Sequence, residues 1–216
     1  MSGKSRNAMS RRRRAAIAAL CVASAAALVW LDHNRPQSTR RNPDESKEQA
    51  KPDDFEKYHG KIFKVANVVD GDTIDIDMPD GEFEHTRIRL RGIDTPESKN
   101  PKVGVMYFGP EAAEFTKNLV LGRDVRIYLD QGNRTRDYYG RLLGYVQLPD
   151  KTFLNEILIS EGYAYADLRF RHSHYNKYKQ LDSAARAQGK GLWANVTRYQ
   201  LPEWLQREKP ALLQSK

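Results

Sequence analysis

Apolar residues recur with the pattern of β-strands in the first half of the central region of the chain. Three stretches carry this pattern: residues 61–69, 73–77 and 86–93. In residues 73–77 the apolar positions alternate with polar ones, as in a strand with one buried face. The turn sequence Pro-Asp-Gly at residues 79–81 precedes the third stretch. We therefore predict a three-stranded meander.

The second half of this region mixes helical and strand patterns. Pro110 opens the run EAAEFTKNLVL, whose apolar residues recur at helical spacing before Gly122. Two further strands and then two further helices follow: residues 124–129, 141–148, 154–161 and 175–188. Each of the later helices ends next to a glycine, as helix C-termini often do. The order predicts an α+β fold dominated by a five-stranded barrel of the oligonucleotide-binding type, with three covering helices.

An uncharged apolar run lies near the N-terminus, at residues 15–31. As a helix this run would span about 26 Å, enough to cross a bilayer. The basic segment 1–14 precedes it, so we predict a cytoplasmic N-terminus and an extracytoplasmic domain. An uncleaved membrane anchor is favoured over a cleaved signal, because the apolar run continues past the small residues 23–25. Secretion after cleavage stays open, as does mitochondrial targeting if the organism is a eukaryote.

Composition divides the rest of the chain. Residues 32–57 contain almost no large apolar residue but several prolines and charges of both signs, which predicts a disordered linker. Residues 58–196 hold the predicted strands and helices and form the domain. In the C-terminal tail, residues 197–216, Leu201 and Trp204 predict a short amphipathic piece that docks on the domain. Nothing in this tail suggests chemistry.

The formal net charge of +8 suggests a polyanionic partner, but its distribution changes this picture. Residues 1–14 contain six basic residues and no acidic one. Residues 59–196 contain 20 lysines and arginines against 19 aspartates and glutamates, so the domain is nearly neutral. Binding to nucleic acid must therefore depend on how individual charges are arranged. The single cysteine, Cys21, excludes an intramolecular disulfide and a cysteine-based metal cage.

Two carboxylate-bearing turns flank the predicted strands of the meander. The first reads DGDT at residues 70–73 and the second reads DTPE at residues 94–97. Either one alone is explained as a common turn sequence. Because the second and third strands are expected neighbours, both turns could lie at one end of the sheet and bring their carboxylates together. Clustered carboxylates need a cation, and oxygen ligands of this kind favour Ca²⁺ or Mg²⁺ over zinc.

The third strand carries an arginine at every second position: Arg87, Arg89 and Arg91. The two-residue period of a strand places all three on one face. A solvated strand face explains Arg87 and Arg91. Arg89 differs, because Asp94 and Glu97 follow closely and would place it beside the predicted cation. A guanidinium binds phosphate oxygens while a metal polarises the same phosphate and activates water, so this set predicts phosphodiester hydrolysis.

Five motifs in order resemble the staphylococcal nuclease family across residues 59–196. They are VVDGDT, RLRGIDTPE, DYYGRLLGYV, FLNEILISEGYA and GKGLW. The resemblance implies a five-stranded barrel with three helices and a monomeric, Ca²⁺-dependent endonuclease that hydrolyses DNA and RNA with little sequence specificity. The alternative is a nuclease-like module that binds nucleic acid or protein without cleaving it. The complete set of arginines and acidic residues favours the enzyme.

The resemblance also implies roles for individual residues. Asp72 and Asp94 would bind Ca²⁺ through their carboxylates and Thr95 through its backbone carbonyl. Asp70 would lie beside these ligands without touching the ion. Glu97 would activate or position the attacking water.

Two arginines complete the implied site. Arg89 would bind the phosphate and stabilise its developing charge, and Arg141 would do the same near the leaving oxygen. Tyr139 would contact the bound nucleotide, with a half-buried aromatic at a strand edge as the alternative. His172 and His174 are a poor zinc site by themselves, and a solvated loop is the preferred interpretation.

Overall fold

The computed structural model describes residues 52–99 and 104–209 of the chain. The predicted basic segment, the predicted membrane anchor at residues 15–31 and most of the predicted linker lie outside these residues. Within the described ranges, no helix has both the length and the apolar character that a membrane span requires.

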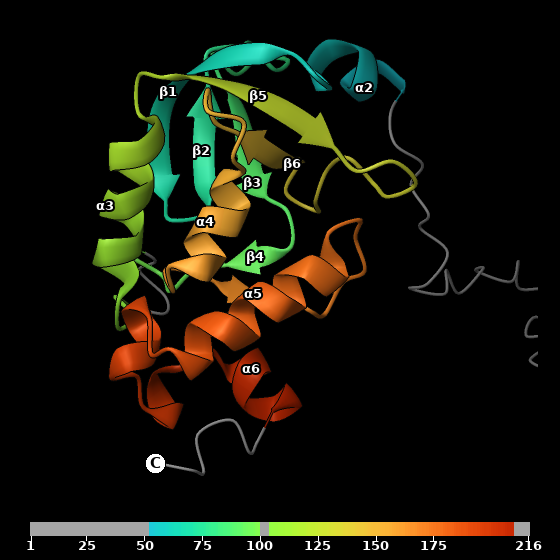
Figure 1. The fold of residues 1–216 in the computed structure, drawn as a ribbon. Coiled ribbons are helices and arrows are strands. Elements are labelled where there is room, and N and C mark those ends of the chain that lie inside the picture. The colour runs from blue at the N-terminus through green and yellow to red at the C-terminus, as the bar shows by residue number, and fades with distance from the viewer. Residues whose placement is uncertain (1–51, 100–103, 210–216) are drawn as a thin grey trace, which may run out of the picture. The chain divides into compact units, whose positions relative to one another are not determined.

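Five strands close into a barrel, as the hydrophobic pattern predicts (Figure 1). They are β1 (Ile62–Asp70), β2 (Thr73–Ile76), β3 (Thr86–Leu90), β5 (Asp124–Leu129) and β6 (Leu142–Gln147). Around the barrel the order is β1-β2-β3-β6-β5, and all neighbours are antiparallel except β3 and β6. The predicted five-stranded barrel of the oligonucleotide-binding type is confirmed.

Branched apolar side chains fill the interior of the barrel and alternate with outward-facing residues along each strand. Ile74, Ile88, Ile127 and Leu142 have no exposed surface. Because Ile88 points into the barrel, the next residue along β3, Arg89, points to its outer surface. The strand that helps to fill the core therefore also presents a cationic side chain outside it.

Three helices cover the barrel where the sequence predicts them: α3 (Gly109–Val120), α4 (Leu154–Ser160) and α5 (Tyr175–Ala187). Helix α3 packs against β1, and α4 contacts both β6 and α5 (Figure 1). The buried residues of α4 include Leu154 and Leu158, which belong to the same apolar cluster as the barrel interior. Helix α4 therefore connects the barrel to the outer helix α5.

The third predicted strand is divided in two. After β3, a separate short strand, β4 (Ile93–Asp94), pairs in antiparallel fashion with β7 (Tyr165–Ala166). Gly92 lies between β3 and β4 with a φ of +76°, a left-handed conformation that glycine adopts without strain. A Cβ atom at Gly92 would lie 2.5 Å from the His172 ring. The chain therefore leaves the barrel at a turn that only glycine fits, which the strand pattern does not reveal.

An additional helix, α2 (Pro52–Tyr58), corrects the prediction of a disordered linker over residues 32–57. Tyr58 is fully buried in the core, and the Asp54 carboxylate accepts a hydrogen bond of 2.8 Å from Arg136. The last residues of the predicted linker therefore belong to the folded domain. Composition does not predict this helix, because few apolar side chains pack it against the barrel. The ion pair between Asp54 and Arg136 also holds it in place.

The predicted docking of the C-terminal tail is confirmed. After the 3₁₀ helices η1 (Gly191–Ala194) and η2 (Arg198–Gln200), the tail forms α6 (Glu203–Glu208). A second apolar cluster joins this tail to β7 and η1, with these buried members among others: Tyr165, Trp193, Leu201, Trp204 and Leu205. The tail is therefore packed against the segment that pairs with β4.

Candidate active site

The turn between β1 and β2 carries two of the predicted site residues, Asp70 and Asp72, on either side of Gly71. Thr116 on α3 donates a hydrogen bond of 2.6 Å to the carbonyl of Gly71. A Cβ atom at Gly71 would lie 2.8 Å from the hydroxyl of Thr95. The turn can therefore approach Thr95 closely because its central residue is glycine.

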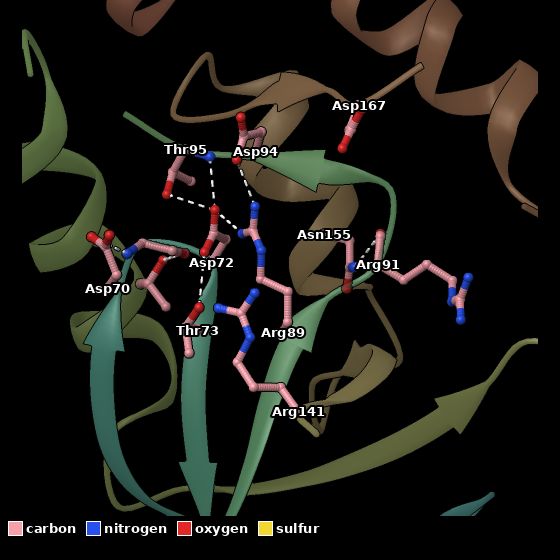
Figure 2. A network of polar contacts seen from close by, with 12 residues as sticks. Asp70, Asp72, Thr73, Arg89, Arg91, Asp94, Thr95, Arg141, Asn155 and Asp167 are labelled. Carbon is pink, nitrogen blue, oxygen red and sulfur yellow. Dashed lines mark hydrogen bonds and ion pairs between the residues drawn. The ribbon is translucent and has the colours of Figure 1, made fainter. Parts of the chain in front are cut away.

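The Asp72 carboxylate is buried and fixed in one orientation. Its Oδ2 atom accepts hydrogen bonds from the backbone N–H of Thr95 at 2.8 Å and from the Thr95 hydroxyl at 3.0 Å. Its Oδ1 atom accepts a hydrogen bond of 3.0 Å from the Thr73 hydroxyl. Two of these contacts join the turn after β1 to the turn after β4, as Figure 2 shows.

Arg89 joins the two predicted aspartates. It lies opposite Thr73 in the β2–β3 register, and its guanidinium forms ion pairs with both Asp72 and Asp94. The Nη2 atom of Arg89 lies 2.5 Å from Oδ1 of Asp94. Figure 2 shows this guanidinium between the two carboxylates. The two carboxylate turns that the sequence places on neighbouring strands therefore meet at one point.

Two further carboxylates lie at the edge of this group. Asp70 accepts hydrogen bonds from the Ser98 hydroxyl at 2.7 Å and from the backbone N–H after it at 2.8 Å. Burial raises the pKa of Glu97 above its ordinary value, and the charge of Asp70, a hydrogen bond with it and the charge of Asp94 raise it further. The neighbouring Arg89 opposes this rise only in part. The site therefore holds more negative than positive charge.

Arg141 and Tyr139 lie in the loop that leads into β6. Leu142 pairs with Ile88 inside the barrel, so Arg141 before it faces outward, as Arg89 does. The guanidinium of Arg141 points toward the group around Asp72 and Arg89 (Figure 2). Tyr139 is 80% exposed, and its ring centroid lies 5.5 Å from the Arg141 guanidinium. The alternative of a half-buried aromatic at a strand edge is therefore wrong.

The donor set at this point fits a hard cation. Asp72 and Asp94 already contact one cationic group, which shows that both carboxylates can face a common centre. Across residues 52–99 and 104–209, no three acidic, histidine or cysteine side chains form a ready-made metal site. A cation here would therefore have two carboxylates and take its other ligands from carbonyl oxygens and water, which Ca²⁺ accepts.

Two residues that the sequence assigns to solvent are buried. Arg91 is 8% exposed and donates a hydrogen bond to the carbonyl of Arg134. His172 is also 8% exposed, and its Nδ1 atom lies 3.2 Å from the Tyr145 hydroxyl. Burial lowers the pKa of His172 to about 4. The prediction of a solvated loop is therefore wrong for His172, because tertiary packing closes over the loop.

Two polar residues near the site, Asn155 and Trp204, are not among the predicted site residues. Asn155, which is fully buried, accepts a hydrogen bond from Val146 and donates one to the carbonyl of Arg91, each 3.0 Å long. A lone asparagine in an apolar helix is a sequence signal for such a role. Trp204 donates a hydrogen bond of 2.8 Å from its indole Nε1 to Oδ2 of Asp94. Trp204 and Asp94 are 110 positions apart in the sequence, and no local pattern connects them.

Together, a closed five-stranded barrel, three covering helices and an arginine between two aspartates define the class of staphylococcal-nuclease-like domains. The family model described as "Staphylococcal nuclease homologue" matches residues 87–195. The chain belongs to this family. It is 37% identical over 136 residues to a protein named "Thermonuclease" from Staphylococcus hyicus, an alignment that covers 62% of this chain and 77% of that protein.

Two other relatives are similar to this chain to a comparable degree. The identity to a "Thermonuclease" from Staphylococcus intermedius is 38% over 137 residues, which covers 63% of this chain and 76% of the relative. The identity to an "Uncharacterized endonuclease" from Escherichia coli O157:H7 is 32% over 154 residues, which covers 70% of this chain and 86% of the relative. The similarity therefore extends over most of each relative.

Proposed function

We propose that this protein is a Ca²⁺-dependent endonuclease that hydrolyses phosphodiester bonds of DNA and RNA with little sequence specificity. The observation that carries the proposal is the guanidinium of Arg89 between Asp72 and Asp94, with two further carboxylates at its edge. Relatives named as thermonucleases and as an endonuclease support the same activity.

Arg89 and Arg141 would bind the phosphate group of the substrate. Arg89 points outward from β3 and Arg141 from the loop just before the neighbouring strand β6, and guanidinium groups form paired hydrogen bonds with phosphate oxygens. Asp137 accepts a hydrogen bond of 2.7 Å from Nε of Arg141, which leaves the terminal nitrogens of that guanidinium directed to the site. Arg141 would therefore stabilise charge near the leaving oxygen. Tyr139, exposed beside it, would contact the nucleotide.

The carboxylates of Asp72 and Asp94 and the backbone carbonyl of Thr95 would hold the ion. When bound, Ca²⁺ supplies positive charge that polarises the phosphate and favours attack by water. Asp72 is suited to this role because Thr95 and Thr73 already fix the rotation of its carboxylate. A ligand that is fixed before the ion binds loses less conformational freedom on binding.

Glu97 would orient the attacking water and accept its proton. Burial raises the pKa of its carboxyl group, and the nearby Asp70 and Asp94 raise it further, which makes it a better proton acceptor than an isolated carboxylate. Asp70 would influence Glu97 without touching the ion, and its Oδ1 atom accepts a hydrogen bond from the Ser98 hydroxyl.

Degradation assays on the purified full-length chain test this proposal. We expect cleavage of both DNA and RNA in Ca²⁺, complete loss of cleavage in chelator, and recovery when excess Ca²⁺ is returned. Cleavage that persists in chelator would exclude the metal-dependent mechanism. Binding of nucleic acid without cleavage under all conditions would instead favour the non-catalytic module.

We also propose that the N-terminal segment anchors the protein in a membrane with the nuclease domain on the extracytoplasmic side. The supporting observation is the apolar run at residues 15–31 after six basic residues. Fractionation of cells, with protease added to intact cells or organelles, tests the location. The domain is expected in the membrane fraction and accessible to protease. Recovery in the medium would indicate secretion, and recovery in mitochondria would indicate targeting there.

A further inference from the structure

Trp204 connects the C-terminal helix to one carboxylate of the site. Its indole N–H donates a hydrogen bond of 2.8 Å to Oδ2 of Asp94, while Arg89 lies on the other oxygen, Oδ1. Arg169 lies 3.8 Å from the same Oδ2 atom. Each oxygen of Asp94 therefore has its own donor, and the plane of the carboxylate is fixed by contacts from opposite ends of the sequence.

The indole of Trp204 is held in place on several sides. It is 9% exposed, and the guanidinium of Arg169 lies 4.3 Å from its ring centroid. Asp167 accepts hydrogen bonds of 2.8 Å and 2.9 Å from Arg169, so the cation above the ring is itself fixed. Tyr165 meets the ring edge-on, with 6.5 Å between centroids. The N–H group of Trp204 is therefore directed to one point.

The same cluster also sets the backbone of Asp94. Asp94 pairs with Tyr165 in the β4–β7 ladder, and Tyr165 is a buried member of the cluster that contains Trp204. Packing of the tail therefore acts on Asp94 twice, through its backbone and through its side chain. Displacement of α6 would loosen both.

We propose that Trp204 is a positioning residue for Asp94, and that the C-terminal helix in this way raises the affinity of the site for a divalent cation. The inference rests on the proposed function, in which Asp94 is a ligand of the ion. Hydrogen bonds to a ligating carboxylate hold it in the orientation that the ion requires, and their removal typically lowers metal affinity about 10-fold to 100-fold.

Trp193 offers a matched control in the same cluster. It is 4% exposed and lies under its own arginine, with Arg186 5.3 Å from the ring centroid. Its Nε1 atom, however, has no hydrogen-bond partner among the described residues. Trp193→Phe removes an N–H group that bonds to nothing, whereas Trp204→Phe removes the one that reaches Asp94. Both variants keep an aromatic ring in the cluster.

Calorimetric titration of Ca²⁺ into the full-length chain, without nucleic acid, tests the inference. We expect the dissociation constant of Trp204→Phe to rise about 10-fold over that of the wild type, and that of Trp193→Phe to change less than about twofold. Equal affinities for the wild type and Trp204→Phe, tighter binding by Trp204→Phe, or equal weakening in both variants would overturn it. Absence of Ca²⁺ binding by the wild type would instead overturn the proposed metal site, and this inference with it.

A second measurement needs no variant. The chain contains three tryptophans, and their indole N–H groups give separate signals in a ¹⁵N-labelled protein. During a Ca²⁺ titration we expect the signal of Trp204 to shift with the midpoint found by calorimetry and that of Trp193 to stay in place. An unmoved Trp204 signal at saturating Ca²⁺ would show that its contact does not sense the ion, which contradicts the inference even if both variants fold poorly.

Discussion

Arg89 and Arg136 each lie between two aspartates, yet the two groups differ in what surrounds them. We name them by position: the site triad is Asp72, Arg89 and Asp94, and the clamp triad is Asp54, Arg136 and Asp80. The residue types are the same in both groups, one arginine and two aspartates. The difference between them therefore shows what separates a structural ion cluster from a functional one.

In the clamp triad, the guanidinium of Arg136 is engaged by both aspartates and by one backbone carbonyl. Arg136 donates to both oxygens of Asp54 at 2.8 to 3.1 Å, to Asp80 at 2.5 Å, and to the carbonyl of Gly140 at 2.9 Å. Hydrogen bonds with Asp54 raise the pKa of Arg136 well above its ordinary value. The clamp joins α2, the β2–β3 connection and the loop before β6. Its role is to hold these three segments together.

The site triad has unmatched charge. Asp70 and Glu97 add two carboxylates near Arg89, and the pKa of Glu97 is raised because burial and these neighbours disfavour its charge. Like charges held at close range destabilise the fold unless a cation offsets them. A group that keeps such a surplus is a candidate for ligand binding, whereas an arginine engaged by two aspartates and a backbone carbonyl is a candidate for structural support.

Replacement of Glu97 by glutamine tests whether the surplus charge serves chemistry. We expect the cleavage rate to fall about 10³-fold, within the range for loss of a general base. The free energy of unfolding should stay equal or rise slightly, because the neutral amide relieves repulsion with Asp70 and Asp94. Nuclease assays and urea unfolding measure the two quantities. Glu114→Gln, at an exposed glutamate on α3, is the control and should change neither.

Replacement of the central arginine in each triad should have different effects on stability and on cleavage. Arg136→Met leaves two carboxylates without their cation, so we expect a loss of about 3 kcal/mol in the free energy of unfolding. The cleavage rate per folded molecule should fall less than tenfold. Arg89→Met should abolish cleavage and also destabilise the protein in chelator.

Addition of Ca²⁺ then distinguishes these two variants. An ion that binds only the folded protein stabilises it by mass action, by about 2.7 kcal/mol at a hundredfold excess over its dissociation constant. Ca²⁺ should therefore restore stability to Arg89→Met to a large extent, because the ion can replace the missing charge between Asp72 and Asp94. In Arg136→Met, Ca²⁺ should restore less stability, because Asp54 and Asp80 lie outside the group of carboxylates around Asp72 and Asp94. Equal rescue of both variants would remove the distinction between the triads.

Much of the fold follows from periodicity alone. The five strands and the three main helices are long enough for their apolar pattern to be read, and the structure confirms them. Short elements are different. Helix α2 depends on the ion pair of Asp54 with Arg136, and β4 depends on the fit of Gly92 against His172. Such contacts join residues that are far apart in sequence, so no local window contains them.

The site residues likewise divide into those that strand patterns predict and those that depend on contacts between distant parts of the sequence. Asp72, Arg89 and Asp94 could be predicted to meet because Asp72 and Arg89 lie on or beside the paired strands β2 and β3, and Asp94 follows β3 closely in sequence. Trp204 could not, because its contact with Asp94 depends on how the tail packs after the barrel has formed. The burial of His172 could not be predicted either, because the sequence shows only a loop before the last helix and the burial results from tertiary packing.

The smallest expected effect is the change of stability with pH. It tests whether the segment that leads to the site triad, and not the clamp triad, makes stability depend on pH. His172 packs against Gly92, just before β4. The charged and titratable groups around it include Asp130, Arg91, His174, Asp167, Tyr145, Tyr175 and Tyr178.

Burial lowers the pKa of His172 to about 4 in the folded protein, against about 6.5 in the unfolded chain. The neutral ring therefore contributes stability that is fully present above pH 6.5 and is lost as the pH falls toward 4. Between pH 7 and pH 5 this amounts to about 2 kcal/mol, at 1.36 kcal/mol per pKa unit. Urea unfolding at each pH should show this loss in the wild type and a shallower one in His172→Gln. Arg136→Met should keep the slope of the wild type, since the clamp takes no part. A flattened slope in Arg136→Met would mean that the two triads are coupled through the barrel, because a change at one would then alter proton binding beside the other.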